Sequence, residues 1–180
     1  MLTVRTDLAM ESHRLWREST KKTTELAGVR AEDGEEGGFP LHRVEILDRE
    51  GEEALGKPRG TYVTVDITDY PKRGQAAAAE AVAAILAPLL PEDGPVLVAG
   101  LGSAAVTADA LGHETVTNLL VTRHLGTLLP DLRPVAALAA GVVGATGIEA
   151  AEWVRGVAEH IRPAAVIVVD ALAARDPQRL

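Results

Sequence analysis

Short apolar runs recur through the second half of the chain, at residues 96–99, 135–140 and 165–169. Strands that are covered on both faces need not alternate apolar and polar residues, so such runs are typical of a buried parallel sheet. Helical patterns separate the runs, over residues 107–126 and 146–161. This alternation predicts an α/β fold with a mainly parallel sheet, right-handed crossovers and helices on both faces.

The first half has a looser pattern. A helix is expected over residues 6–20, capped by its first residue, and an acidic, glycine-rich loop over residues 31–38. Strands are expected over residues 41–48 and 61–67, at an antiparallel or mixed sheet edge, because β-branched residues gather there. Residues 75–86 form an alanine-rich helix, and its expected core stripe is Val82, Ile85 and Leu86.

Composition narrows the class of protein. The 180 residues suffice for one domain with a full core, and 47% of them are hydrophobic but only 3% aromatic. The core is therefore expected to consist of Ala, Val, Leu and Ile. A formal charge of −8 argues against a nucleic-acid binder and fits a basic or neutral partner.

The chain has no cysteine, which excludes a disulfide, a thiolate zinc site and a cysteine nucleophile within it. Its first ten residues include Arg5 and Asp7 and lack the apolar segment of a signal peptide. The longest apolar stretch, over residues 76–90, contains Glu80 and Pro88 and is not expected to cross a membrane. These features fit a cytoplasmic enzyme.

The stretch GLGSAA at residues 100–105 follows an apolar strand and resembles a dinucleotide-binding fingerprint. That fingerprint requires an acidic residue at the end of the next strand, about twenty residues further on. Residues 118–122 contain no carboxylate. Nucleotide binding is therefore not expected, no cofactor is predicted, and Gly100 and Gly102 indicate a tight turn or a close backbone approach.

Two aspartates come just after apolar strands, and they are the main candidates for catalysis. Asp170 follows the run 165–169 directly, and Asp109 lies ten residues beyond the run 96–99. Parallel strands end at the same sheet edge, where open α/β sheets place their sites. Neighbouring carboxylates share a proton, so that one acts on water as a base and the other acts as an acid. Taken alone, an aspartate at the position of Asp109 is more often a helix first-turn residue, and one at the position of Asp170 more often caps the segment that follows.

Other candidate groups are less specific. His113 and His124 lie eleven residues apart in a helix expected to break near Gly112, and no HExxH pattern marks a metal site. The glycine-rich loop 141–147 precedes a helix, which Thr146 and Glu149 are spaced to cap. It is either a tight turn or a source of backbone N–H groups for a substrate. Its candidate contact residues are Gly141, Gly144, Thr146 and Gly147.

Six sequence blocks together resemble the germination protease family of spore-forming bacteria. They are VRTDLAMES at 4–12, GKPRGTYVTVD at 56–66, VAGLGSAAVTADALG at 98–112, VTRHL at 121–125, AAGVVGATGIEAAEWVRG at 139–156 and VIVVDALAAR at 166–175. The resemblance implies an aspartic-type endopeptidase that degrades small acid-soluble spore proteins during germination, with a fold like that of hydrogenase-maturation proteases. The family's functional aspartates correspond to Asp109 and Asp170.

The resemblance further implies a self-processing zymogen, a homotetramer and a location in the cytoplasm of the spore core. The expected cut in the RTDLA motif lies between Asp7 and Leu8, which makes residues 1–7 a propeptide. The expected partners are small basic or neutral protein substrates, without direct contact to nucleic acid or membrane.

Three departures from the family pattern leave alternatives open. Ala108 and Ala140 replace prolines, and family members continue past the DALA block. We therefore expect residues 1–180 to be a single α/β peptidase domain that forms the N-terminal portion of the full family domain. The alternatives are a truncated, non-catalytic α/β homologue and a metal-dependent maturation-protease-like domain. In the latter, Asp109, His113 and Asp170 would hold a divalent ion.

Overall fold

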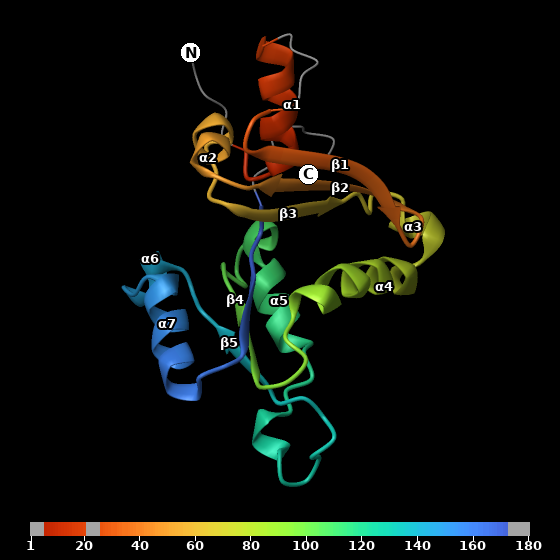
Figure 1. The fold of residues 1–180 in the computed structure, drawn as a ribbon. Helices are drawn as coiled ribbons and strands as arrows, with labels where there is room; N and C mark the ends of the chain where they lie inside the picture. Colours follow the sequence, from red (N-terminus) through yellow and green to blue (C-terminus); the bar gives the residue numbers. More distant parts are fainter. Residues whose placement is uncertain (1–5, 21–25, 173–180) are drawn as a thin grey trace. The chain divides into compact units, whose positions relative to one another are not determined.

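The computed structural model describes residues 6–20 and 26–172. The chain divides into two compact units, the first formed by Met1–Leu89 with Leu172–Leu180 and the second by Leu90–Ala171. Within the described residues, each unit contains a three-stranded sheet (Figure 1). The single peptidase domain expected over residues 1–180 stays a prediction, because compactness does not decide whether the units fold together.

The sheet of the first unit is antiparallel, in the order β1-β2-β3. Its strands are β1 (Val29–Glu36), β2 (Phe39–Ile46) and β3 (Gly60–Val65). The loop predicted over residues 31–38 is wrong, because most of it is β1. Gly37 and Gly38 form the β1–β2 turn with φ of 57° and 84°, values that tight hairpin turns favour. The acidic side chains suit β1 because charge protects an exposed edge strand.

The helices of the first unit are short, and α2 has a clear cap at each end. They are α1 (Ala9–Thr20), α2 (Arg49–Leu55), α3 (Tyr70–Arg73) and α4 (Gln75–Leu86), followed by the 3₁₀ turn η1 (Ala87–Leu89). The pattern analysis missed α2. The side chain of Asp48 accepts a hydrogen bond from the Gly51 N–H at 3.0 Å and starts this helix. Gly56, with φ of 64°, ends it.

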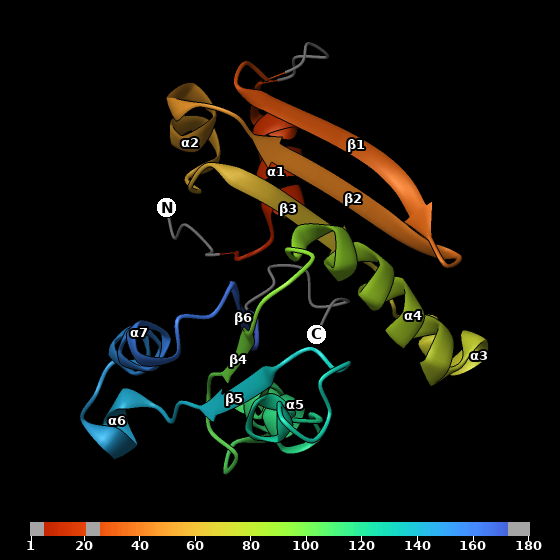
Figure 2. The ribbon, with the colours of Figure 1, turned by 60° about the horizontal axis from the view of Figure 1, so that its bottom comes forward.

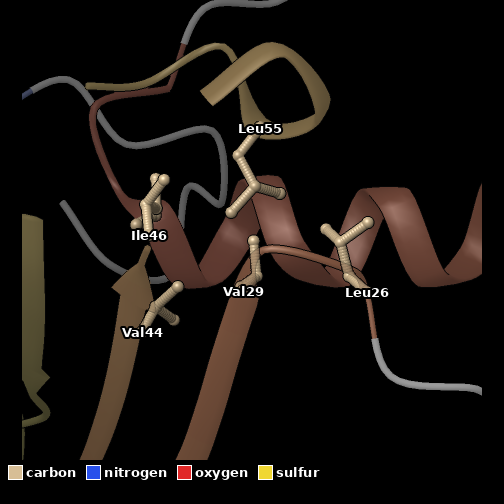
Figure 3. Close-up of a cluster of buried hydrophobic side chains, with 6 residues drawn as sticks. Leu26, Val29, Val44, Ile46 and Leu55 are labelled. Atoms are coloured by element: carbon tan, nitrogen blue, oxygen red, sulfur yellow. The ribbon is translucent and has the colours of Figure 1, made fainter. Parts of the chain in front are cut away.

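Two clusters of buried side chains hold the first unit together. The larger one joins α1 and α2 to the sheet and contains Ala9, Leu26, Val29, Val44, Ile46 and Leu55, with Trp16 and Tyr62 packed against it (Figure 3). The smaller one joins Phe39 to Ala78 and Ala81 of α4. The predicted core stripe of α4 is therefore wrong. Val82 and Leu86 are 39% and 38% exposed and Ile85 is half-buried, because α4 approaches Phe39 through its small alanines.

The sheet of the second unit is parallel, in the order β5-β4-β6. Its strands are β4 (Val96–Gly100), β5 (Val135–Ala139) and β6 (Ala165–Val169), and the central β4 is buried along its whole length. The helices are α5 (Leu111–Thr117), α6 (Val143–Thr146) and α7 (Ala150–Ile161). In both views α5 and α7 lie on opposite sides of this sheet (Figures 1 and 2). The predicted α/β fold with a parallel sheet is confirmed.

The helical segments of the second unit are shorter than predicted. The expected helix over residues 107–126 divides into the 3₁₀ turn η2 (Thr107–Asp109), α5 and the 3₁₀ turn η3 (Arg123–Leu125). Gly112 lies inside α5 instead of breaking it. The helix expected from Thr146 begins at Ala150, where the Glu149 N–H donates to Glu152 Oε2 at 3.2 Å. No helix within residues 6–20 and 26–172 is long and apolar enough to span a bilayer.

Candidate active site

The turn after β4 determines the position of Asp109. Gly102 has a φ of 92°, and a Cβ atom on it would lie 2.1 Å from the Asp109 carbonyl oxygen and 2.9 Å from Oδ1. Only glycine fits there, for reasons of both conformation and space. The Ser103 N–H donates to Asp109 Oδ2 at 2.9 Å and also lies 3.1 Å from the Asp109 carbonyl oxygen. The half-buried carboxylate is thereby folded back onto the end of β4.

Asp170 lies at the same edge of the sheet, directly after β6. Gly100 of β4 pairs with Val169 of β6, and the Leu101 N–H extends this ladder to the Val169 carbonyl oxygen at 2.9 Å. The Asp170 side chain is exposed, and its Oδ1 accepts a hydrogen bond from the Ala171 N–H at 2.9 Å. Both aspartates thus follow neighbouring strands at one sheet edge, the placement that the strand pattern predicts. Their roles stay predictions.

A close contact between α5 and the sheet fixes this edge. A Cβ atom on Gly112 would lie 2.3 Å from the Leu101 carbonyl oxygen and 2.5 Å from that of Val169. A Cβ atom on Gly100 would lie 2.0 Å from the Gly112 carbonyl oxygen. The first turn of α5 therefore packs backbone to backbone on the ends of β4 and β6. In the sequence, Gly100 at the strand end and Gly112 in the helix mark this contact. Sequence analysis interpreted only Gly100 as a possible close backbone approach.

A hollow of about 270 Å³ opens at this edge, over the ends of β4 and β5. His113 of α5 lines it together with Gly102 and Ser103, which contact Asp109, and with Gly141 from the predicted substrate loop. We call it the sheet-edge hollow. Pattern analysis did not identify it, because its wall combines the turn after β4 and His113 with residues 139–145, which lie much further along the chain.

The rest of the predicted substrate loop has internal hydrogen bonds. The Thr146 hydroxyl accepts from the Ile148 N–H at 3.2 Å and lies 3.2 Å from the Val142 carbonyl oxygen. Gly147, with φ of 70°, ends α6. Most of residues 141–147 therefore lie in or next to α6, and Gly144 lies inside this helix. A contact between this loop and a substrate stays a prediction.

The two histidines considered for a metal site lie on different elements, His113 on α5 and His124 on η3. Within the described ranges, no group of three or more His, Cys, Asp and Glu side chains is arranged to hold a metal ion.

The predicted processing bond lies in the first unit, just before α1. The Lys57 ammonium group donates to the carbonyl oxygens of Thr6 and Asp7, both at 3.1 Å. The Asp7 carbonyl belongs to the bond that is expected to be cut. Its Leu8 N–H donates to Thr6 Oγ1 at 3.2 Å. Both polar groups of this peptide bond therefore have hydrogen-bond partners within the unit.

Comparison of the sequence with family models and with curated proteins points to the same family in each case. The family model described as germination protease matches residues 6–180. The chain is 42% identical over its whole length to the germination protease of Caldanaerobacter subterraneus, covering 57% of that protein. It is also 42% identical over its whole length to the germination protease of Clostridium perfringens, covering 58% of it. With the germination protease of Priestia megaterium it shares 41% identity over 98% of its own length and 52% of the relative's.

The chain thus spans a little more than half the length of these curated relatives. The match to the family model covers nearly all of the chain, including the turn after β4, the end of β6 and the segment before α1. These observations show that the chain belongs to the germination protease family.

Proposed function

We propose that this chain carries the catalytic aspartate pair of a germination protease and hydrolyses peptide bonds with water. The observation that supports this most is the pairing of Gly100 with Val169. This register brings the turn that holds Asp109 and the strand end that precedes Asp170 to one sheet edge. An open hollow with polar groups lies at this edge, beside the turn that holds Asp109, and such a hollow is the usual setting of a site.

In this proposal the two carboxylates divide the work of acid and base. Two neighbouring carboxyl groups share one proton, because both do not readily ionise together. The ionised one takes a proton from water, and the resulting hydroxide attacks the substrate carbonyl carbon. The protonated one donates to the carbonyl oxygen or the leaving amine. The Ser103 N–H holds Asp109 in one orientation, as a group that positions a water molecule requires.

The proposed substrates are small acid-soluble spore proteins, bound as extended or unfolded chain. The formal charge of −8 favours basic or neutral partners of this kind. In this proposal the sheet-edge hollow receives a substrate side chain, and Gly141 offers a wall without a side chain of its own. The proposal needs no metal ion and no organic cofactor.

We further propose that the protein is made as a zymogen and cut between Asp7 and Leu8 in the cytoplasm of the spore core. Assembly as a homo-oligomer belongs to the same proposal. This processing site is proposed from the RTDLA motif at residues 5–9.

A non-catalytic α/β homologue is the alternative, and one observation favours it. The chain spans 52–58% of the length of the relatives cited above. A protein of this kind would keep the fold and the family motifs without turnover.

One experiment separates the two functions. The purified chain is incubated with a small acid-soluble spore protein at mildly acidic pH, and peptide masses are followed over time. Cleavage should be abolished by Asp109→Asn and by Asp170→Asn with the melting temperature nearly unchanged, since acid–base transfer contributes about 10²–10⁴-fold. A merely capping aspartate would instead cost about 0.5–2 kcal/mol of stability with no specific loss of activity. Absence of cleavage by the parent chain would favour the non-catalytic homologue.

A further inference from the structure

β5, teal in Figure 2, is an edge strand of the parallel sheet in the second unit. The Val96 N–H of β4 donates to the Pro134 carbonyl oxygen, and the Ala140 N–H donates to the Gly100 carbonyl oxygen, both at 2.9 Å. Backbone groups alternate in direction along a strand, so these two bonds fix the pattern between them. The even-numbered residues of β5 face β4, and the odd-numbered residues turn their N–H and C=O groups away from it.

The first outward residue, Val135, has partners within the unit. The Thr122 N–H donates to the Val135 carbonyl oxygen at 3.0 Å, and the Val135 N–H donates to Thr122 Oγ1 at 2.9 Å. Thr122 thus bonds to β5 much as a residue of a neighbouring strand would. Within residues 6–20 and 26–172, the outward N–H and C=O groups of Ala137 and Ala139 have no such partner. We call this open stretch of backbone the β5 edge.

The β5 edge lacks the features that commonly protect a sheet edge. Exposed edge strands are often guarded by charged side chains or by proline, and β1 carries acidic residues of this kind. β5 has the sequence VAALA and continues into Ala140 and Gly141, so this stretch contains no charge and no proline. Ala137 is half-buried and Ala139 is exposed. Another backbone can therefore approach this edge closely.

The β5 edge leads into the candidate site. Ala139 and Gly141 line the sheet-edge hollow together with Ser103, which holds Asp109 through its N–H. An extended chain paired with Ala137 and Ala139 would therefore continue into this hollow. β6 forms the other edge of the sheet, but within the described ranges none of its residues lines the hollow.

We propose that the β5 edge binds an extended segment of the protein substrate as an added strand. This inference rests on the proposed function and specifies how that site holds its substrate. A peptide that adds to a sheet edge bonds through its main chain, and pockets beside the edge select among its side chains. Here Ala137 and Ala139 supply the main-chain bonds, and the sheet-edge hollow is the pocket. Only extended or unfolded chain can pair in this way.

Amide hydrogen exchange, followed residue by residue with NMR, tests the pairing directly. In the free protein, the amides that face β4 should exchange slowly and those of Ala137 and Ala139 rapidly. The probe is a small acid-soluble spore protein, added to the Asp109→Asn protein so that the probe stays intact. Exchange at Ala137 and Ala139 should then slow at least about tenfold. The amide of Val168 on β6 should not change.

Matched peptides test the same pairing from the side of the substrate. The peptide VRTDLAMES has the sequence of residues 4–12, which contain the proposed cut. N-methylation removes hydrogen-bond donors, and only every second residue of an added strand faces the edge. Methylation of one alternate set should weaken binding to the Asp109→Asn protein about tenfold, whereas the other set should have little effect. Fluorescence anisotropy of labelled peptides measures both, and equal effects of the two sets would contradict strand addition.

A variant of the edge removes a donor from the protein itself. Ala139→Pro deletes one outward N–H, at a position where an edge strand tolerates proline. It should weaken binding of the unmodified peptide about three- to tenfold. Ala139→Gly is the control, because it also removes the methyl group but keeps the N–H. Circular dichroism checks that both variants are folded, and equal binding by the two would argue against the β5 edge.

Cleavage by the parent chain keeps this inference apart from the proposed function. Cleavage without protection of Ala137 and Ala139 would overturn strand addition at β5 and leave the aspartate pair in place. Protection without cleavage would refute the catalytic function and support the β5 edge as a peptide-binding surface. If neither the spore protein nor the peptide binds, or if protection appears on β6 instead, the proposal is wrong.

Discussion

The two units hold their sheets together by different means. In the first unit, large apolar side chains fill the space between helices and sheet, and Phe39 is completely buried. In the second, α5 reaches the sheet through backbone contacts at Gly100 and Gly112. Val166 and Val168 of the edge strand β6 remain 41% and 51% exposed. The stability of the first unit thus depends on the volume of its side chains. At the candidate site of the second unit, stability depends instead on glycines, whose lack of a side chain lets the backbones touch.

The candidate functional residues follow the same division. Lys57 holds the predicted processing bond with a side chain, whereas Ser103 holds the Asp109 carboxylate with a backbone N–H. A backbone donor cannot be replaced without changing the course of the chain, so it suits a group that must keep one position. A side-chain donor suits a contact that has to be released.

The largest effect should come from removing volume in the first unit. Phe39→Ala should lower the free energy of unfolding by about 3–5 kcal/mol, because it leaves a cavity against Ala78 and Ala81. Denaturant titration measures the change. Phe39→Leu is the control and should cost clearly less, since it keeps most of the volume. Equal losses for the two variants would show that the ring volume is not what stabilises this cluster.

Adding side-chain volume, instead of removing it, should destabilise the second unit. Gly112→Ala adds one methyl group against backbone atoms 2.3–2.5 Å away, which cannot rotate aside. A cost of about 1–3 kcal/mol or more is expected in denaturant titration. Gly156→Ala is the matched control, because a Cβ atom there meets nothing within 4 Å and α7 should gain about 0.5–1 kcal/mol. If Gly112→Ala lowers the free energy of unfolding no more than Gly156→Ala does, α5 does not pack as closely on the sheet as described.

The second unit was more predictable from sequence than the first. The run 165–169 has the bounds of β6, because an unbroken run of apolar and mostly β-branched residues favours a strand, even at the edge of the sheet. β1 was missed because an edge strand tolerates charge, so its acidic sequence resembles a loop. α2 was missed because seven residues contain too few turns to show a period.

The candidate site was predictable only in part. The positions of Asp109 and Asp170 at one edge follow from strand ends in a parallel sheet. The contact of Ser103 with Asp109 depends on the conformation of Gly102, which the residue type permits but does not specify. The sheet-edge hollow depends on how residues 100–113 meet the distant segment 139–145, and no local pattern contains that information.

A smaller, kinetic effect should follow from releasing the processing bond. Lys57→Met keeps most of the length of the side chain but removes the two hydrogen bonds to the Thr6 and Asp7 carbonyl oxygens. Under the proposed function, loss of residues 1–7 should become several-fold faster, since charged hydrogen bonds of about 1.5–3 kcal/mol no longer hold the segment. Intact-mass measurement over time checks this. Lys72→Met is the control, as Lys72 pairs with Asp69 elsewhere in the unit. Slower processing of Lys57→Met would mean that Lys57 assists the cut.

The smallest effect is a change of stability with pH that originates in the first unit. The pKa of His13 is lowered by burial and by Arg17, so the unfolded chain takes up a proton at a higher pH than the folded chain does. His13 should therefore destabilise the fold as pH falls below its ordinary value of about 6.5. In chloride buffer, the melting temperature of the parent minus that of His13→Gln should be higher at about pH 8 than at about pH 5. Asp33 opposes this effect, so the difference should grow when both proteins also carry Asp33→Asn. A difference that is constant with pH, or larger at low pH, would show that His13 is stabilised in its charged form and that its surroundings differ from those described.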